Sequence, residues 1–351
     1  MIEPGVLQSA DRLRRLAGRW LDAAGLGPVE TPARRVHAGR GIEVLGYGGA
    51  PQPAPVLALL PAPIKRPYIW DLAPSVSVVR RCLERGLNVY LLRWADPAEA
   101  RLDLGLADYA DTLIAEALGA IERDTGRRRP VLLGHSLGGT LAAIFAALRP
   151  ERVGGLVLLG APLRFGPAGT GAFAALLGTM PPARRGTGRR GTVAGTLLDL
   201  ASVAAAPDVF VWDRWIDRLA CAWDPERLAV HYRVERWTLD EVPMCGRLLD
   251  DVVDLLYRED RFMGRRLRLG GRTARPDAVT APILAVLDPR DRLVPPASVL
   301  PFLAAAGTSD TTLLRYDGEP GTALRHVGVL VGRAAHRSLW PQILAWAARR
   351  A

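Results

Sequence analysis

One stretch of the sequence decides the fold: Val131-Leu132-Leu133-Gly134-His135-Ser136-Leu137-Gly138-Gly139. A short aliphatic strand runs into the pattern Gly-x-Ser-x-Gly, and the mostly apolar residues 140–147 that follow predict a helix. A strand, a tight turn and a helix in this order are the context of a nucleophile elbow. Because the turn is so tight, the positions two before and two after Ser136 must lack bulky side chains, as Gly134 and Gly138 do. We therefore predict that Ser136 is a nucleophile and that the backbone N–H of Leu137, at the start of the helix, stabilises negative charge.

The surrounding sequence predicts a parallel sheet around this elbow. Apolar segments typical of buried strands alternate with segments whose apolar spacing is helical. Strands are expected at 56–60, 87–92, 131–135 and 153–159, with shorter ones near 34–37 and 43–47, and helices at 75–85, 109–124 and 140–147. Continuously apolar strands that alternate with helices indicate a mostly parallel sheet with helices on both faces.

The alternation stops after Phe165 and resumes with a strand at 282–287. An insertion at this place predicts a helical cap over the site, and its tryptophans are expected in the cap core or along an acyl tunnel. These tryptophans are Trp212, Trp215, Trp223 and Trp237. Ahead of the sheet, the apolar spacing of residues 8–24 predicts an amphipathic helix. We therefore expect a helical extension at 1–40, a core formed by 41–165 plus 275–351, and a cap at 166–274.

Composition argues against several other classes of protein. The chain has 351 residues, 49% of them hydrophobic, so it can bury a large core. Its net charge of +10 comes from scattered arginines, since Lys65 is the only lysine, and we expect no nucleic-acid partner. One cluster, Arg184-Arg185-Gly186-Thr187-Gly188-Arg189-Arg190, is expected to be a solvated loop; contact with the phosphates of a nucleotide-bearing substrate, or with an anionic surface, is the alternative.

Targeting signals and cysteine spacing point to a reducing compartment. We expect no secretory signal at the N-terminus, and no run of about 18 apolar residues predicts a membrane span. Cys82, Cys221 and Cys245 have no C-x-x-C spacing, which argues against a disulfide framework or a zinc site. A cytoplasmic protein without a bound metal or cofactor is therefore expected.

A serine nucleophile needs an adjacent base and a third group that orients the base. In chains with a nucleophile elbow, the acid and then the histidine follow the serine. The strand at 282–287 is followed by two acids, and we predict Asp291 because it directly precedes the next element, with Asp288 as the alternative. As the base we predict His326, which follows a strand at 312–316 and a glycine-rich loop.

Two other histidines, His336 and His135, are not expected to act as the base. His336 lies on the approach to the last helix, where we expect a surface residue. His135 precedes the nucleophile, and we expect its side chain to point away from the reacting face. A direct role for His135 is the minor alternative.

Several further stretches follow the same order as in a known family. They are Ile64-Lys65-Arg66-Pro67-Tyr68-Ile69-Trp70-Asp71-Leu72, Val89-Tyr90-Leu91-Leu92-Arg93-Trp94, Leu158-Leu159-Gly160-Ala161-Pro162-Leu163-Arg164-Phe165, Asp291-Arg292-Leu293-Val294-Pro295-Pro296-Ala297-Ser298 and His326-Val327-Gly328. Together with the elbow, they resemble the catalytic subunit of class III polyhydroxyalkanoate synthases over most of the chain. The resemblance implies an α/β-hydrolase fold and an enzyme that transfers hydroxyacyl groups from coenzyme A thioesters to a growing polyester.

The resemblance also implies roles for individual residues. By position, Ser136 is the acyl-accepting nucleophile, His326 its base and Asp291 the partner carboxylate. It further implies a second, smaller synthase-type subunit as a partner, with a homodimer as the alternative. Association with polyester granules in the cytoplasm is the corresponding expectation for localisation.

Two features depart from the family's pattern. The family uses cysteine at the elbow, and a thiolate exchanges with thioesters more readily than a hydroxyl does, so Ser136 favours ester chemistry. Pro63 has no N–H to offer in the loop after the first central strand, so the second oxyanion donor is expected to be Ile64, with Ala62 as the alternative.

The sequence as a whole predicts a polyhydroxyalkanoate synthase-like acyltransferase that acts on hydroxyacyl thioesters or polyester. A serine esterase, thioesterase or polyester depolymerase is the first alternative. The second is a weakly active protein that binds granules or a synthase subunit.

Overall fold

The structure is a computed structural model that describes residues 4–48, 54–166, 169, 176–177 and 191–350. The arginine cluster at 184–190 lies outside these residues. Within the described ranges, no single helix is both long and apolar enough to cross a membrane. The helical segments Gly195–Ala205 and Asp208–Cys221 together meet that criterion, but the chain bends by 104° between them.

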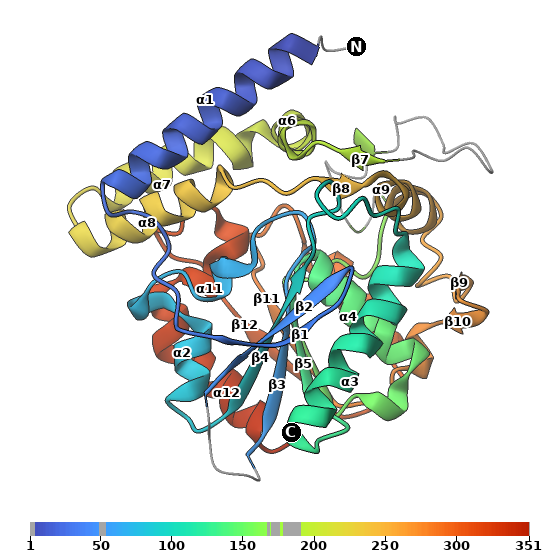
Figure 1. Cartoon of the computed structure of the whole chain (residues 1–351). Coiled ribbons are helices and arrows are strands. Elements are labelled where there is room, and N and C mark those ends of the chain that lie inside the picture. The colour runs from blue at the N-terminus through green and yellow to red at the C-terminus, as the bar shows by residue number, and fades with distance from the viewer. Residues whose placement is uncertain (1–3, 49–53, 167–168, 170–175, 178–190, 351) are drawn as a thin grey trace.

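An eight-stranded sheet forms the centre of the molecule (Figure 1). Its strands are β1 (Arg34–Ala38), β2 (Ile42–Tyr47), β3 (Val56–Leu60), β4 (Asn88–Trp94), β5 (Val131–His135), β6 (Gly155–Leu159), β11 (Ile283–Leu287) and β12 (Thr311–Arg315). Their order is β1-β2-β4-β3-β5-β6-β11-β12, and the pairs from β4 to β12 are all parallel. The predicted mostly parallel sheet is confirmed, and it brings the segments that follow β3, β5 and β11 to one edge.

Side chains alternate along the central strands and fill a layer on each face of the sheet. In β3, Val56, Ala58 and Leu60 belong to one buried cluster, whereas Leu57 and Leu59 belong to the other. The first cluster includes side chains of α3 (Leu113–Thr125), α4 (Leu137–Leu148) and α10 (Leu300–Ala305). The second includes side chains of α2 (Val78–Leu83), α11 (Gly328–Val331) and α12 (Trp340–Ala348). Helices therefore cover both faces, as predicted.

His336 is buried beside the second of these layers, so its predicted surface position is wrong. It lies in the helical segment η10 (Ala335–Leu339), only 4% exposed, and its ring stacks on Trp340. The ring nitrogen Nε2 donates to the carbonyl oxygen of Leu330 at 2.7 Å. A single polar residue just before an apolar helix gives no sequence signal for this inward orientation.

Helices inserted between β6 and β11 form a cap above the sheet (Figure 1). They are α6 (Gly195–Ala205), the short segment η5 (Asp208–Trp212), α7 (Asp213–Cys221) and α8 (Pro225–Thr238). The N-terminal helix α1 (Pro4–Ala23) lies along the cap and packs on α6 and α8. The remaining elements of the insertion are β7 (Thr192–Val193) paired with β8 (Met244–Cys245), α9 (Gly246–Asp251), η6 (Val252–Arg258), and β9 (Leu267–Leu269) paired with β10 (Arg272–Ala274).

The observed boundaries differ from the expected ones in two places. β1 pairs with β2 in the main sheet, so a boundary at residue 40 divides a hairpin that belongs to the core. The second half of the predicted cap also joins the core, because Phe262 and Leu267 are buried in the cluster around α4 and β10 packs on α4. Strands of two or three residues are too short to give a periodic pattern in the sequence.

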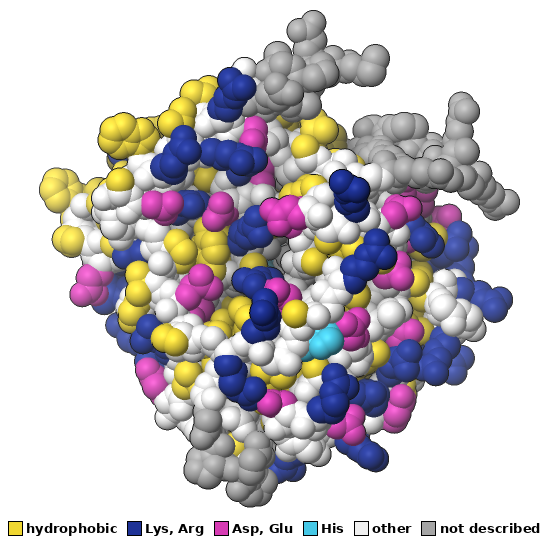
Figure 2. All heavy atoms as spheres, viewed as in Figure 1, with side chains coloured by type: hydrophobic (Ala, Val, Ile, Leu, Met, Phe, Trp, Pro, Cys, Tyr) yellow, Lys and Arg dark blue, Asp and Glu magenta, His cyan; other side chains and the backbone are white. Residues whose placement is uncertain are grey.

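The cap tryptophans occupy two different environments. Trp212, Trp215 and Trp223 are 65%, 55% and 95% exposed, so they form neither a cap core nor a tunnel wall. Trp237 alone among the four is buried. Figure 2 shows hydrophobic side chains gathered at the upper left of the molecule, where α1 and α7 lie.

Candidate active site

The elbow between β5 and α4 has the strained backbone that its sequence predicts. Ser136 has φ +53° and ψ −133°, a conformation that residues other than glycine rarely adopt. A side chain at Gly134 would clash with the backbone of Gly139, and one at Gly138 would clash with the carbonyl oxygen of Leu60. These close approaches pack the first turn of α4 against the end of β3. This close packing holds Ser136 in its strained conformation, half-buried beside the segment that follows β3.

The acid and the base predicted from the sequence lie side by side. Nδ1 of His326 is 2.7 Å from Oδ2 of Asp291. The other carboxylate oxygen, Oδ1, accepts hydrogen bonds from the backbone N–H groups of Leu293 at 2.9 Å and Val294 at 3.2 Å. Burial raises the pKa of Asp291, but His326 and the two N–H donors outweigh burial, so the pKa lies below its usual value. Asp291 is therefore ionised, and its Oδ2 accepts a hydrogen bond from the N–H at Nδ1 of His326.

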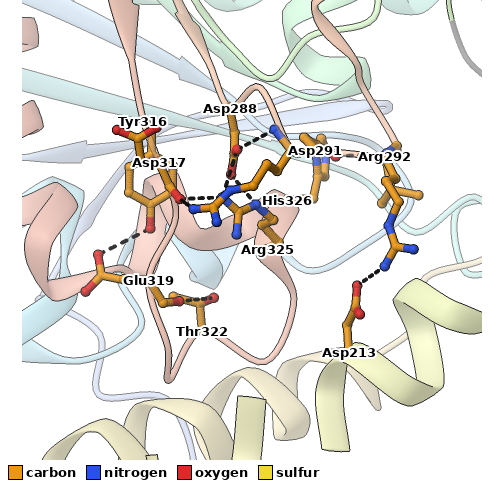
Figure 3. A network of polar contacts seen from close by, with 12 residues as sticks. Asp213, Asp288, Asp291, Arg292, Tyr316, Asp317, Glu319, Thr322, Arg325 and His326 are labelled. Atoms are coloured by element: carbon orange, nitrogen blue, oxygen red, sulfur yellow. Dashed lines mark hydrogen bonds and ion pairs between the residues drawn. The ribbon is translucent and has the colours of Figure 1, made fainter. Parts of the chain in front are cut away.

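The alternative acid, Asp288, faces a different partner. Its Oδ2 lies 2.6 Å from Nε of Arg325, and its Oδ1 accepts a hydrogen bond from the backbone N–H of Arg290 (Figure 3). Asp288 thus orders the loops on either side of the acid–base pair, while Asp291 contacts the imidazole itself.

A cavity of about 260 Å³ joins Ser136 to the pair formed by His326 and Asp291. Ser136 and His326 both line it, and most of its wall is apolar. The apolar wall includes Ile69, Trp70, Leu198, Phe210, Trp237, Met244, Leu249, Val252 and Leu324. Within the described residues, the Ser136 hydroxyl forms no hydrogen bond, and Nε2 of His326 also has no recorded partner. Hydrogen bonds of this kind are often long without substrate and shorten when it binds.

The expected oxyanion donors border the same cavity. Leu137, Ile64 and Ala62 all line it, and in the described part of the chain their backbone N–H groups donate to no recorded acceptor. The carbonyl oxygen of Pro61 is engaged by the indole N–H of Trp94 at 2.8 Å, which fixes the start of this loop. Pro63 is buried and does not line the cavity. Ile64 remains the predicted second donor, with Ala62 as the alternative.

His135 lies against the base instead of pointing away from it, which corrects the expectation for its side chain. Its ring centroid is 4.7 Å from that of His326. Its Nε2 is 3.0 Å from the backbone carbonyl oxygen of His326, and since that oxygen can only accept, Nε2 carries the proton. His135 therefore packs beneath the base as a neutral imidazole. The contact joins β5 to a loop 191 residues away, so sequence neighbours give no signal for it.

Two buried histidines make the protein sensitive to acid. Burial lowers the pKa of His135 to about 3 and that of His336 to about 4. In the unfolded chain both have a pKa of about 6.5, so the unfolded state binds more protons below that pH. We expect each histidine to lower the free energy of unfolding by about 1.4 kcal/mol per pH unit as the pH falls from about 6.5 to about 4.

Urea denaturation at pH 6.5 and pH 5 measures this effect. In His336→Gln, the decrease should be smaller than in the parent protein by the contribution of one histidine. Carboxylates titrate alike in both proteins and cancel from the comparison. An identical pH dependence of parent and variant would contradict a buried neutral His336.

A charged cluster at the cavity wall was not singled out from the sequence. Nζ of Lys65 donates to the carbonyl oxygen of Thr238 at 2.7 Å and lies 3.6 Å from Oε1 of Glu241. Burial lowers the pKa of Lys65 and raises the pKa of Glu241. Because Lys65 directly follows Ile64, these contacts attach the loop with the expected oxyanion donor to the cap. The signal in the sequence that could have identified this cluster is Lys65 itself, because it is the only lysine of an arginine-rich chain.

Comparisons with known proteins agree with this architecture. A family model described as "alpha/beta hydrolase fold" matches residues 83–180. A monoacylglycerol lipase from Paleococcus ferrophilus superposes with a TM-score of 0.55 at 16% identity, covering 88% of this chain and 99% of that one. The enol-lactonase from Burkholderia xenovorans LB400 has a TM-score of 0.52 at 15% identity, covering 90% and 99%. The predicted fold is thus confirmed: the chain has an α/β-hydrolase fold.

Relatives found by sequence similarity indicate which group of α/β-hydrolase-fold proteins this chain is related to. The "Poly(3-hydroxyalkanoate) polymerase subunit PhaC" of Haloferax mediterranei is 29% identical over 346 residues, which cover 97% of this chain and 68% of the relative. The protein of the same name from Allochromatium vinosum is 25% identical over 330 residues, covering 93% and 91%. The chain is therefore homologous to PhaC polymerase subunits, and the resemblance stated from its motifs is confirmed.

Proposed function

We propose that this protein is an acyltransferase that takes hydroxyacyl groups from coenzyme A thioesters through an acyl-enzyme on Ser136. The observation that carries the proposal is the His326–Asp291 pair at the wall of an apolar cavity that also exposes Ser136. The homology to PhaC polymerase subunits supports the choice of a hydroxyacyl thioester as the acyl donor. Coenzyme A enters as part of the substrate, and we propose no resident cofactor or metal.

The reaction begins when Oγ of Ser136 attacks the thioester carbonyl carbon. Nε2 of His326 takes the hydroxyl proton, and Asp291 keeps the second proton on Nδ1 and stabilises the imidazolium. The oxyanion is held by the N–H of Leu137 with a second donor from the loop at Ile64. Collapse of the tetrahedral intermediate breaks the C–S bond, and His326 returns its proton to the departing thiolate.

The acyl-enzyme is resolved by a second nucleophile. His326, now neutral, takes the proton of another hydroxyacyl group's hydroxyl as that oxygen attacks the ester carbonyl carbon. The bond from this carbon to Oγ of Ser136 then breaks, His326 returns the proton to Oγ, and the released chain is longer by one unit. Water in place of that hydroxyl gives a free hydroxy acid. The apolar wall of the cavity favours the first outcome, because it accommodates an alkyl or polyester chain and limits access of water.

Incubation with 3-hydroxybutyryl-coenzyme A, and separately with short poly(3-hydroxybutyrate), distinguishes the two outcomes. We expect release of coenzyme A together with oligomers or polymer in the first reaction. Release of free hydroxy acid without polymer would instead establish the thioesterase alternative, and cleavage of the polyester alone would establish the depolymerase.

The serine nucleophile is the specific observation that favours the hydrolase alternative. Ser136 stands where the resembling family has cysteine. An oxygen ester on Ser136 suits ester hydrolysis or transesterification, whereas a thiolate exchanges readily with thioesters. The variant Ser136→Cys is therefore the informative comparison. We expect it to shift the product ratio from free acid toward polymer, and an unchanged ratio would show that the cavity, not the nucleophile, controls the product.

We further propose that the protein binds the surface of its polyester product through an exposed apolar face of the cap. This face consists of Trp212, Trp215, Ile216, Leu219 and Trp223, each more than half exposed. Isolated apolar side chains are normal on a surface, but a contiguous group such as this one marks a binding face. Co-sedimentation with poly(3-hydroxybutyrate) particles should fall in Trp215→Ser and remain in Leu313→Ser, which removes an exposed leucine from β12.

The same pair of variants tests the other partners considered for the chain. Loss of a dimer in Trp215→Ser, with particle binding retained, would assign this face to a homodimer. Retained particle binding with an oligomeric state unchanged from the parent would leave a second synthase-type subunit as the partner of this face.

A further inference from the structure

A carboxylate of the cap contacts the loop that carries the base. Asp217 lies on α7, and its Oδ1 accepts a hydrogen bond from the backbone N–H of Gly321 at 2.8 Å. Its Oδ2 accepts another from the backbone N–H of Ala323 at 2.7 Å. Ala323 precedes His326 by three residues, so the two hydrogen bonds fix the chain one turn before the imidazole.

The backbone needs support at this point. Gly321 has φ +92° and Ala323 has φ +57°. A left-handed conformation at alanine costs on the order of 1 kcal/mol or more, and it persists only where surrounding contacts impose it. Ala323 is buried, with 2% of its surface exposed, so water does not replace Asp217 as the acceptor for its N–H. The carboxylate therefore stabilises a loop conformation that the sequence itself disfavours.

Asp217 is in turn held by the next helix of the cap. Nδ1 of His231, on α8, lies 2.8 Å from Oδ2 of Asp217, and the His231 side chain is 2% exposed. Since an ionised carboxylate only accepts, Nδ1 carries the proton. On its far side, Nε2 of His231 lies 3.7 Å from Glu235, which is paired with Arg214. Three N–H donors thus surround Asp217 and account for its orientation.

The loop of the acid is attached to the same part of the cap. Arg292 directly follows Asp291 and forms an ion pair with Asp213 at the start of α7 (Figure 3). It forms a second ion pair with Asp208 at the start of η5. These ion pairs are half-exposed and contribute little to stability by themselves. They show, however, that the segment 208–221 contacts the chain beside both members of the acid–base pair.

We propose that Asp217 is a positioning residue that fixes the loop 321–326, and thereby the place of His326 relative to Ser136, with His231 orienting its carboxylate. The inference rests on the proposed function, in which His326 is the base. A misplacement of about 1 Å in a reacting group can lower the rate on the order of 100-fold. Asp217 itself does not line the cavity, so we expect its replacement to affect kcat far more than KM.

Kinetics of the variants with p-nitrophenyl butyrate test the proposal, with each value normalised to active sites titrated by a fluorophosphonate. In Asp217→Asn, the amide group keeps one acceptor but turns an N–H toward the other backbone donor. We expect kcat to fall about 10-fold in Asp217→Asn and about 100-fold in Asp217→Ala, with KM changed less than twofold. His231→Gln should give a smaller loss in the same direction.

The matched control is Glu226→Gln on α8. Glu226 pairs with Arg333 and touches no residue of the elbow or of the acid–base pair, so its kcat should equal that of the parent. A purely structural role for Asp217 would reduce the fraction of titrated sites and leave kcat per site unchanged. That result would overturn the proposal.

Amide hydrogen exchange supplies a readout that does not depend on chemistry. We expect the amides of Gly321 and Ala323 to lose protection in Asp217→Ala and to keep it in Glu226→Gln. Unchanged protection would also overturn the inference. If the parent protein failed to react with any acyl donor, the proposed function would fall, and exchange alone would decide whether Asp217 holds the loop.

Discussion

Ser136→Ala is expected to lower kcat for ester and thioester substrates by about 10⁵- to 10⁶-fold. Without Oγ there is no acyl-enzyme, so both transfer and hydrolysis lose their first covalent step. What remains is direct attack by water, assisted only by binding and by the N–H groups near Leu137. The measurement is the rate of coenzyme A release from 3-hydroxybutyryl-coenzyme A, together with labelling by a fluorophosphonate.

Ser338→Ala is the matched control. Ser338 is exposed, and among the described residues its hydroxyl bonds only to the carbonyl oxygen of Ala334, so neither rate nor labelling should change. Because Ser136 occupies a strained position, the unfolding transition of each variant should be recorded beside its activity. A folded Ser136→Ala that retained a tenth of the parent rate would show that the nucleophile lies elsewhere.

Asp291→Asn is expected to lower kcat by about 10⁴-fold while leaving KM nearly unchanged. The backbone N–H groups of Leu293 and Val294 require an acceptor, so the amide oxygen takes their side and the NH₂ group faces His326. Nδ1 of His326 must then accept a hydrogen bond, which moves its proton to Nε2. In that tautomer the imidazole cannot receive the proton of Ser136.

Asp288→Asn separates the two acids that compete in the sequence. Asp288 pairs with Arg325 and does not contact the imidazole, so we expect a decrease of less than 10-fold. Equal losses in the two variants would mean that both carboxylates act through the order of the loop. A larger loss in Asp288→Asn would reverse the assignment.

The sequence predicts those features of the site that depend on short motifs and on the order of the strands along the chain. The elbow depends on Gly134, Ser136 and Gly138 within five residues, and the order of acid and histidine follows from the order of the strands. Sequence reasoning therefore selected Asp291 over Asp288 and His326 over His336, and the structure places the selected pair within hydrogen-bonding distance. Their catalytic roles remain predictions that the variants above test.

The contacts that support the site could not be predicted, because they join segments far apart in the chain. His135 meets His326 across 191 residues, and Asp217 meets Ala323 across 106. Neither contact has a periodic pattern or a motif. In the sequence, Asp217 is one of two acids on an amphipathic helix, and nothing there distinguishes it from Asp213.

In the cap, likewise, the sequence does not predict which apolar residues are buried. An inserted segment rich in tryptophan predicts a cap core. In the structure, Asp217 on α7 faces the loop of His326, while Trp212, Trp215 and Trp223, on α7 and beside its two ends, are exposed. Periodicity identifies an amphipathic helix, whereas tertiary packing decides which of its faces is covered. For the same reason, the predicted end of the cap at residue 274 is too late in the chain, since Phe262 and Leu267 already pack in the core.

The most direct test of the central claim is mass spectrometry of the parent protein, quenched with acid shortly after mixing with 3-hydroxybutyryl-coenzyme A. The expected result is a hydroxybutyryl adduct on the peptide that contains Ser136, formed as coenzyme A is released. The adduct should be absent in Ser136→Ala. Release of coenzyme A without an adduct on this peptide, or an adduct on another residue, would contradict an acyl-enzyme at Ser136.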